Sequence, residues 1–234
     1  NVKPSCRFYS AGSSEEFGEI ETTPQTLEHP LNPRSPYGAS KCAARHIVKV
    51  YRDSYNLFAI HCILFNHESI LRGKQFVTRK ITSNLAYIKY KIEKQESFDC
   101  FELGNIDARR DWSYSNDFME AIWIMLNQDK PDEYILSSNK DYSIKEFINM
   151  CCKSLKLDYT WELDEDPLNT KMYINKKLAI TINEKYYRPA EIHIMRGDSR
   201  ETYKKLQWEP KTSLQEMINI MCNYDYKLLI NEEV

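Results

Sequence analysis

Hydrophobic and polar positions follow two different periods along the first third of the chain. An almost unbroken apolar run at 57–65 is typical of a strand that is covered on both faces of a sheet. Apolar residues recur at helical spacing over 35–55, and a short strand-like run at 6–11 comes before them. Because strand, long helix and strand follow one another, the pattern predicts a crossover unit with parallel strands.

The rest of the chain continues this alternation. Strands are predicted at 98–103 and 134–137, and helices at 78–94 and 118–126. Two further helices begin with capping boxes, one formed by Ser143 and Glu146 and the other by Ser213 and Glu216. The order of elements indicates the α/β class.

The predicted helix at 35–55 begins with residues that suit a helix start and carry possible chemistry. Ser35 is a good N-cap, and Pro36 fits the first helical position. Tyr37 and Lys41 are four residues apart and share one face, where a lysine ammonium favours a phenolate that acts as a base. The same spacing occurs at Tyr87/Lys91 and Tyr173/Lys177, so the spacing alone does not decide between a base and a solvated helix face.

Small polar residues follow the first predicted strand. Ser13, Ser14 and Glu15 stand where open α/β sheets bind ligands, at the carboxyl end of a strand. The alternative is an ordinary helix start with Ser14 as its N-cap.

Composition narrows the class of protein. Of 234 residues, 42% are hydrophobic and 28% charged, which describes a soluble globular protein, and no stretch has the length and hydropathy of a membrane span. The net charge of −2 gives no reason to expect nucleic-acid or membrane partners. Seven cysteines without a Cys-x-x-Cys pair predict reduced thiols, a cytoplasmic location and no metal site. The six glycines form no Gly-x-Gly-x-x-Gly motif.

Several segments together carry a resemblance that none carries alone. In order along the chain they are 13–15, 34–41, 55–59, 63–69 with 76–80, 103–112, and 186–191. With them the chain resembles the GDP-mannose 4,6-dehydratase family of the extended short-chain dehydrogenase/reductase superfamily. The resemblance runs from about residue 7 to about residue 225.

The resemblance implies a reaction in which NADP is used in both directions. Tyr37 would take the proton of the sugar 4-hydroxyl as hydride leaves C4, and Lys41 would hold the nicotinamide ribose. Ser13 would bind the 4-oxygen. Glu15 would remove the C5 proton and help the 6-hydroxyl leave as water, before hydride returns to C6. The product would be GDP-4-keto-6-deoxymannose.

Other positions match cofactor or substrate contacts of the family. His67 and Arg72 are expected near NADP, together with Tyr37 and Lys41. The residues expected around the GDP-mannose substrate are Asn66, Lys80, Arg110, Arg188 and Glu191. Guanidinium groups suit a diphosphate because their donors are forked. Each charged member of this set has the alternative of being a surface residue. The resemblance further implies a homodimer or homotetramer.

The family pattern also implies parts that this sequence does not show. Its Gly-rich turn and first strands are expected before residue 1, so we expect an incomplete Rossmann-like, doubly wound parallel sheet with a smaller α/β substrate-binding domain. Residues 1–66 and 105–138 would belong to the NADP-binding domain, and residues 67–104 and 139–234 to the nucleotide-sugar domain. We expect the 234 residues alone to bind NADP poorly and to turn over nothing measurable.

Individual positions also depart from the family pattern. Ser13 stands in place of a threonine, Glu16 and Phe17 in place of a leucine and a tyrosine, and Leu71 in place of an arginine.

Two alternatives remain open on the residues alone. One is a related nucleotide-sugar dehydratase or epimerase. The other is a non-catalytic fragment that binds a nucleotide sugar or dimerises.

Overall fold

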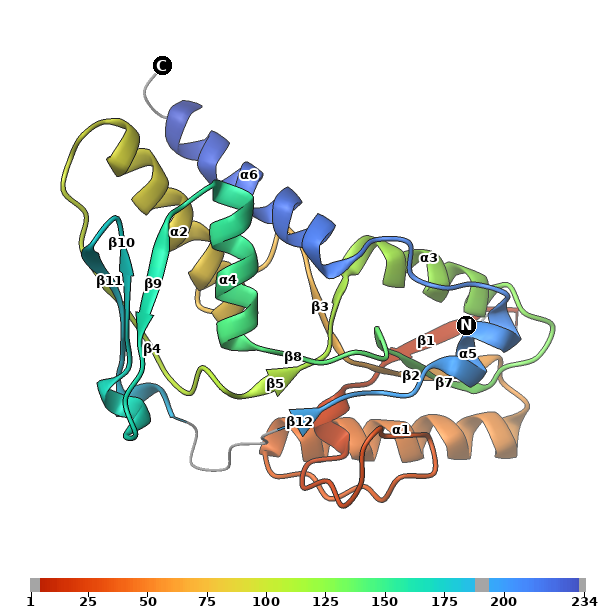
Figure 1. Ribbon diagram of the computed structural model, residues 1–234. Coiled ribbons are helices and arrows are strands. Elements are labelled where there is room, and N and C mark those ends of the chain that lie inside the picture. The colour runs from red at the N-terminus through yellow and green to blue at the C-terminus, as the bar shows by residue number, and fades with distance from the viewer. Residues whose placement is uncertain (1–4, 188–193, 232–234) are drawn as a thin grey trace. The chain divides into compact units, whose positions relative to one another are not determined.

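The structure, a computed structural model, describes residues 5–187 and 194–231, which form two units (Figure 1). The described part of the first unit is 5–67, 109–141 and 194–212, and that of the second is 68–108, 142–187 and 213–231.

The first unit holds a parallel sheet and three helices. Its elements are β1 (Phe8–Ala11), the 3-10 turn η1 (Ser14–Glu16), α1 (Pro36–Tyr55), β2 (Ala59–Leu64), the start of β3 (Asn66–Glu68), β5 (Arg109–Arg110), β6 (Trp112–Tyr114), α3 (Ser115–Leu126), β7 (Glu133–Leu136), β12 (Ile194–Met195) and α5 (Arg200–Leu206).

The sheet has the strand order β1-β2-β7, with both pairs parallel. Helix α1 connects β1 to β2 and lies along one face, while α3 and α5 lie on the other (Figure 1). The predicted crossover unit and the α/β class are therefore confirmed.

The apolar run predicted as a two-sided strand is β2, and all six of its residues are buried. Ile60, Cys62 and Leu64 pack against side chains of α3. Ile63 points to the opposite face, where it packs with Phe17 from the loop after η1. Because successive side chains of a strand alternate between faces, one continuous apolar run serves both cores.

Asp111, between β5 and β6, is a fully buried carboxylate of the first unit. Its backbone N–H donates to the carbonyl of Met195 at 3.1 Å, and its Oδ1 accepts from the N–H of Ser138 at 2.7 Å. Burial raises the pKa of Asp111 to about 7, although the Ser138 N–H opposes that rise. Through its backbone N–H and its carboxyl group, Asp111 thus connects three segments of the chain. Its burial favours the protonated carboxyl.

The second unit combines a mixed sheet with a group of helices. Its elements are α2 (Val77–Glu93), β4 (Phe101–Leu103), β8 (Tyr142–Ser143), α4 (Ile144–Leu155), β9 (Tyr159–Glu162), the 3-10 turn η2 (Pro167–Asn169), β10 (Lys171–Ile174), β11 (Lys177–Ile182), the 3-10 turn η3 (Glu184–Tyr186) and α6 (Leu214–Asn231).

The sheet of the second unit has the order β4-β11-β10-β9, in which only β4 and β11 run parallel. Helices α2, α4 and α6 pack on one another. The predicted capping boxes are both present, since Glu146 accepts from the Ser143 N–H at 2.6 Å and Glu216 from the Ser213 N–H at 2.8 Å.

A buried ion pair joins α2 to α6. Arg79 donates through Nη2 to Oδ1 of Asp225 at 2.6 Å, and the hydroxyl of Thr82 donates to Oδ2 of the same carboxylate at 2.7 Å. All three residues are buried. Because each charge has a partner, the burial is tolerated, and the pair fixes how the two helices align.

The observed units place residues 194–212 with the parallel sheet, whereas the sequence-based division assigned 139–234 to the nucleotide-sugar domain. That the two parts bind cofactor and nucleotide sugar stays a prediction. All seven cysteines are free thiols. Within 5–187 and 194–231, no helix combines the length and the hydropathy needed to cross a membrane.

We expect Asp111 to make stability fall as pH rises. A carboxyl whose pKa is raised in the folded state from 3.8 to about 7 stabilises the fold fully below about pH 4, and this contribution is lost by about pH 7. The loss corresponds to about 4 kcal/mol. In Asp111→Asn, which keeps an oxygen for the Ser138 N–H, the free energy of unfolding by urea should lack this decline.

Asp129→Asn, at an exposed position of the same unit, is the matched control and should keep the wild-type pH profile. Parallel profiles of wild type and Asp111→Asn between pH 4 and 7 would contradict the expectation.

Candidate active site

Helix α1 begins as its sequence predicts. Ser35 is the N-cap, with its hydroxyl oxygen accepting from the N–H of Gly38 at 2.9 Å, and Pro36 is the first helical residue. This start places Tyr37 in the first turn, where 51% of the residue is exposed.

The turn that carries Glu15 is capped by Ser13, so the alternative with Ser14 as N-cap is wrong. The Ser13 hydroxyl accepts from the N–H of Glu15 at 3.2 Å. Glu16 completes a capping box, because its carboxylate accepts from the N–H of Ser13 at 2.8 Å. Ser14 is buried, and Glu15 is only partly so.

The start of α1 and the Glu15 turn are in direct contact. The Ser35 hydroxyl donates to Oε2 of Glu15 at 2.9 Å while it caps the helix. Gly38 lies so close to the turn that a Cβ there would be 2.5 Å from the carbonyl oxygen of Glu15. The local sequence indicates only the capping role of Ser35, because no spacing rule points to a partner twenty residues earlier.

Lys41 connects the same helix to the end of β1. Its Nζ donates to the carbonyl of Ala11 at 2.8 Å and lies 5.5 Å from the centre of the Tyr37 ring. The predicted group of Ser13, Glu15, Tyr37 and Lys41 therefore gathers in one unit, around the carboxyl end of β1 and the start of α1.

The second Tyr-x-x-x-Lys pair shows why spacing is insufficient. Lys91 Nζ lies 5.6 Å from the Tyr87 ring, much as Lys41 does from Tyr37. Its ammonium, however, pairs with the exposed Glu96, three residues beyond the end of α2. What distinguishes the pair on α1 is its place beside Glu15.

Three other predicted residues lie in the first unit. His67 has its Nδ1 3.0 Å from the carbonyl oxygen of Phe65, and its ring is 5.4 Å from that of Phe118. Asn66 is the first residue of β3, and Arg110 in β5 donates to the Arg109 carbonyl at 2.8 Å. All three predicted residues are partly buried.

The second unit holds two more of the predicted residues. Arg72 pairs with Glu68 at 3.2 Å, and its guanidinium lies 3.6 Å from the centre of the Phe76 ring. Lys80 Nζ lies 3.9 Å from the centre of the Tyr186 ring. Arg188 and Glu191 fall outside the described residues.

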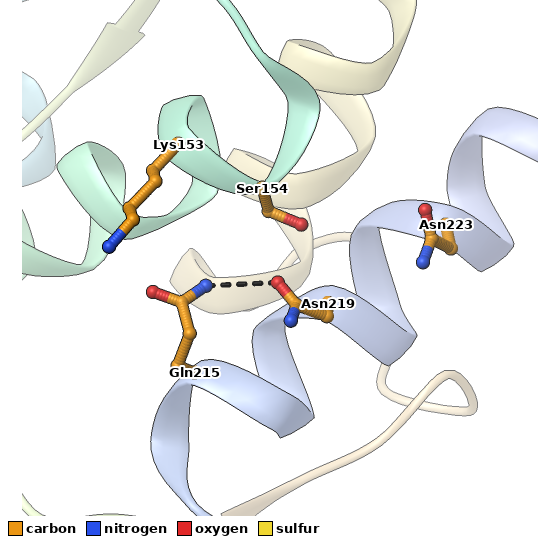
Figure 2. A pocket seen from close by; sticks show the side chains of 5 residues that line it. All are labelled: Lys153, Ser154, Gln215, Asn219 and Asn223. Atoms are coloured by element: carbon orange, nitrogen blue, oxygen red, sulfur yellow. Dashed lines mark hydrogen bonds between the residues drawn. The ribbon is translucent and has the colours of Figure 1, made fainter.

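A pocket of about 330 Å³ lies in the second unit between α4 and α6 (Figure 2). It is lined by Lys153, Ser154, Gln215, Asn219 and Asn223. The amide of Gln215 donates to Oδ1 of Asn219 at 2.9 Å and lies along the wall of the pocket. None of the predicted site residues lines it.

Comparison with known proteins decides the family. The family model described as GDP-mannose 4,6 dehydratase matches residues 1–221. The chain belongs to the GDP-mannose 4,6-dehydratase family. Named members are similar along nearly the whole chain: those of Cricetulus griseus and Homo sapiens are 38% identical over 96% of it, and that of Vibrio cholerae is 38% identical over 97%. The chain spans 59% of the length of the first two relatives and 62% of the third.

Solved structures of low sequence identity share the fold. RMD from Pseudomonas aeruginosa complexed with NADPH aligns with a TM-score of 0.76 at 18% identity, covering 94% of this chain and 66% of that one. dTDP-glucose 4,6-dehydratase from Bacillus anthracis in complex with NAD aligns with a TM-score of 0.74 at 18% identity, covering 98% and 64%. The predicted Rossmann-like α/β architecture is thereby confirmed.

The contact between Gly38 and the Glu15 turn predicts that Gly38→Ala destabilises the protein. Alanine is the better helix former, but its Cβ would overlap a backbone oxygen, so a cost of about 1–3 kcal/mol is expected in urea unfolding.

Gly73→Ala is the matched control. A Cβ at Gly73 would meet only the end of the flexible Gln75 side chain, which can move aside. Equal stability of the two variants would show that α1 does not press against the Glu15 turn.

Proposed function

We propose that this chain provides the acid–base groups of a GDP-mannose 4,6-dehydratase, converting GDP-mannose to GDP-4-keto-6-deoxymannose and water. The observation that carries the proposal is the contact of the Glu15 turn with the helix start that bears Tyr37 and Lys41. Membership of the dehydratase family supports it.

The reaction needs proton transfers at the 4-hydroxyl, at C5 and at the 6-hydroxyl of one sugar, and the site offers two groups of suitable chemistry. Tyr37 takes the proton of the 4-hydroxyl during oxidation at C4, and the ammonium of Lys41 lies 5.5 Å from the centre of its ring. The 4-ketone makes the C5 proton acidic, and Glu15 then removes it. The same carboxyl group passes a proton to the departing 6-hydroxyl, which leaves as water. When hydride is returned to C6, C5 takes up a proton and Tyr37 gives up the one it gained, directly or through solvent, so both groups regain their starting states.

Glu15 and Ser13 can each make further hydrogen bonds to a sugar. A carboxylate accepts several hydrogen bonds, and Ser35 uses one of those of Glu15. Since Ser35 holds Oε2, the carboxylate keeps one orientation while it exchanges protons with the sugar. The hydroxyl of Ser13 lies at the start of the same turn and is proposed to donate to the 4-oxygen.

We propose NADP as the cofactor. When bound, it supplies the redox chemistry by taking hydride from C4 and returning it to C6. The site suits a nicotinamide ribose, because an ammonium has three donors and Lys41 directs one of them to the Ala11 carbonyl. RMD from Pseudomonas aeruginosa, which shares the fold, holds NADPH. His67 and Arg72 remain proposed cofactor contacts, and Asn66, Lys80, Arg110, Arg188 and Glu191 remain proposed contacts of GDP-mannose.

The protein in its natural full-length form is expected to convert GDP-mannose in the presence of NADP⁺, with the 4-keto-6-deoxy product detected by NMR. Tyr37→Phe should lower kcat by about 10²- to 10⁴-fold, the range typical of a lost acid–base group. Tyr87→Phe, which alters the second Tyr-x-x-x-Lys pair, should leave kcat unchanged.

Absence of product from the wild type would contradict the proposal. Calorimetric binding of GDP-mannose without turnover would favour a nucleotide-sugar-binding protein instead. Equal kcat values for the two tyrosine variants would remove Tyr37 from the mechanism.

We further propose that the protein forms a homo-oligomer through α1. Ile47, Tyr51 and Tyr55 are spaced four apart on one side of this helix, and each is more than half exposed. The rings of Tyr51 and Tyr55 are 5.4 Å apart. A continuous exposed apolar stripe of this kind is typical of a surface that another protein covers.

Ile47→Glu should therefore shift the mass measured by light scattering toward the monomer, because a buried unpaired carboxylate opposes association. Lys49→Glu changes the charge on another side of the same helix and should not. Unchanged mass in Ile47→Glu would exclude this surface.

A further inference from the structure

A buried chain of polar side chains lies directly behind the Glu15 turn. Glu16 and His61 each have 0% exposure, and Oε1 of Glu16 is 3.1 Å from Nε2 of His61. The other ring nitrogen, Nδ1, is 3.0 Å from the hydroxyl oxygen of Ser10. With the bond from the Ser13 N–H to Glu16, these hydrogen bonds connect Ser10 of β1, through His61 of β2, to the start of the turn.

The direction of these bonds follows from their chemistry. An ionised carboxylate only accepts, so His61 carries a proton on Nε2 and donates it to Glu16. In the neutral imidazole Nδ1 is an acceptor, and the Ser10 hydroxyl then donates to it. His61 thus links β1 and β2 to one carboxylate oxygen of Glu16 through hydrogen bonds.

Stability alone is a weak account of this pair. Oε2 of Glu16 is buried and has no hydrogen-bond partner among the described residues, so the cost of removing the carboxylate from water is only partly offset. Replacing both partners of a buried hydrogen bond by apolar groups of the same shape is often nearly neutral for stability. The arrangement is better explained by what it holds in place.

What Glu16 holds is the turn bearing two proposed site residues. Its Oε1 fixes the Ser13 N–H, and the Ser13 hydroxyl in turn fixes the N–H of Glu15. In a 3-10 turn successive side chains point about 120° apart. Anchoring Glu16 inward therefore directs Glu15 away from the core, toward the Ser35 hydroxyl.

The backbone at Gly12 leaves room for this pair and for nothing larger. A Cβ at Gly12 would lie 2.4 Å from Nε2 of His61 and 2.6 Å from Oε1 of Glu16. The Gly12 N–H also donates to the Cys62 carbonyl at 2.8 Å, which ties this backbone to β2. The pair and the strand ends thus form one closely packed unit.

We propose that Glu16 and His61 are positioning residues for Glu15, setting the orientation of its carboxylate for removal of the C5 proton. The kinetic part of this inference rests on the proposed dehydratase function, whereas the structural part does not.

The test uses a disruptive and a conservative variant at each position of the full-length protein. Glu16→Leu and His61→Phe remove the bond at nearly constant volume. Glu16→Gln keeps an oxygen that accepts from both donors, and His61→Gln keeps an N–H near the position of Nε2. The disruptive variants should lower kcat by about 10- to 100-fold with an unchanged KM for GDP-mannose, and the conservative variants should restore most of it.

Hydrogen exchange provides a readout that needs no activity. In Glu16→Leu and His61→Phe, the amides of Ser13 and Glu15 should exchange at least about tenfold faster than in wild type, while amides of α4 stay unchanged. The double variant should be no worse than either single variant in both measurements, because the two residues act through one bond.

Glu19→Gln is the control in the same loop. Its carboxylate is exposed and pairs with Arg34 at the surface, so neither kcat nor exchange should change. Unchanged exchange at Ser13 and Glu15 in Glu16→Leu would overturn the positioning role even in a protein without dehydratase activity. Accelerated exchange with unchanged kcat would overturn its connection to Glu15 chemistry. Failure of Glu16→Leu to fold leaves the decision to Glu16→Gln, His61→Phe and His61→Gln.

Discussion

The hydroxyl of Ser35 makes two hydrogen bonds on which the geometry of the site depends. It accepts from the Gly38 N–H, one of the free backbone donors in the first turn of α1. It also donates to the carboxylate of Glu15. One oxygen therefore determines both where the helix begins and where the carboxylate lies. Since Gly38 has no Cβ, the helix approaches the turn closely enough for both hydrogen bonds to form.

The buried charged groups of the two units differ in how completely they are paired. In the second unit, both carboxylate oxygens of Asp225 have hydrogen-bond partners, and the contact aligns two helices. Glu16 in the first unit keeps an unpartnered oxygen, as does Asp111. A buried polar atom without a hydrogen-bond partner destabilises the fold. In the case of Glu16, this atom lies in the same turn that carries Glu15. The unpaired oxygen of Glu16 beside Glu15 agrees with a role of Glu16 in the chemistry of the site rather than in stability.

Local sequence patterns predict the helices and strands, but they do not predict the side-chain contacts between distant segments. The helix at 35–55, the buried strand at 57–65 and both capping boxes depend on near neighbours, and the structure confirms them. The bond between Ser35 and Glu15 joins residues twenty apart, and that between Glu16 and His61 joins residues forty-five apart. The apolar pattern places His61 in a buried strand, but no spacing rule indicates that a carboxylate from another segment contacts it. Ser13 and Ser14 are equally good N-caps by sequence, so the choice between them depends on backbone geometry.

The central claim is that Tyr37, Lys41 and Glu15 carry out oxidation and elimination on a single bound sugar. The most direct test is to supply the full-length protein with NADP⁺ and GDP-mannose that carries deuterium at both C4 and C5, in ordinary water. The account predicts a 4-keto-6-deoxy product with the C4 deuterium at C6 and a solvent proton in place of the C5 deuterium, both visible by NMR. A product without deuterium at C6, or recovery of an epimerised sugar without loss of water, would contradict it.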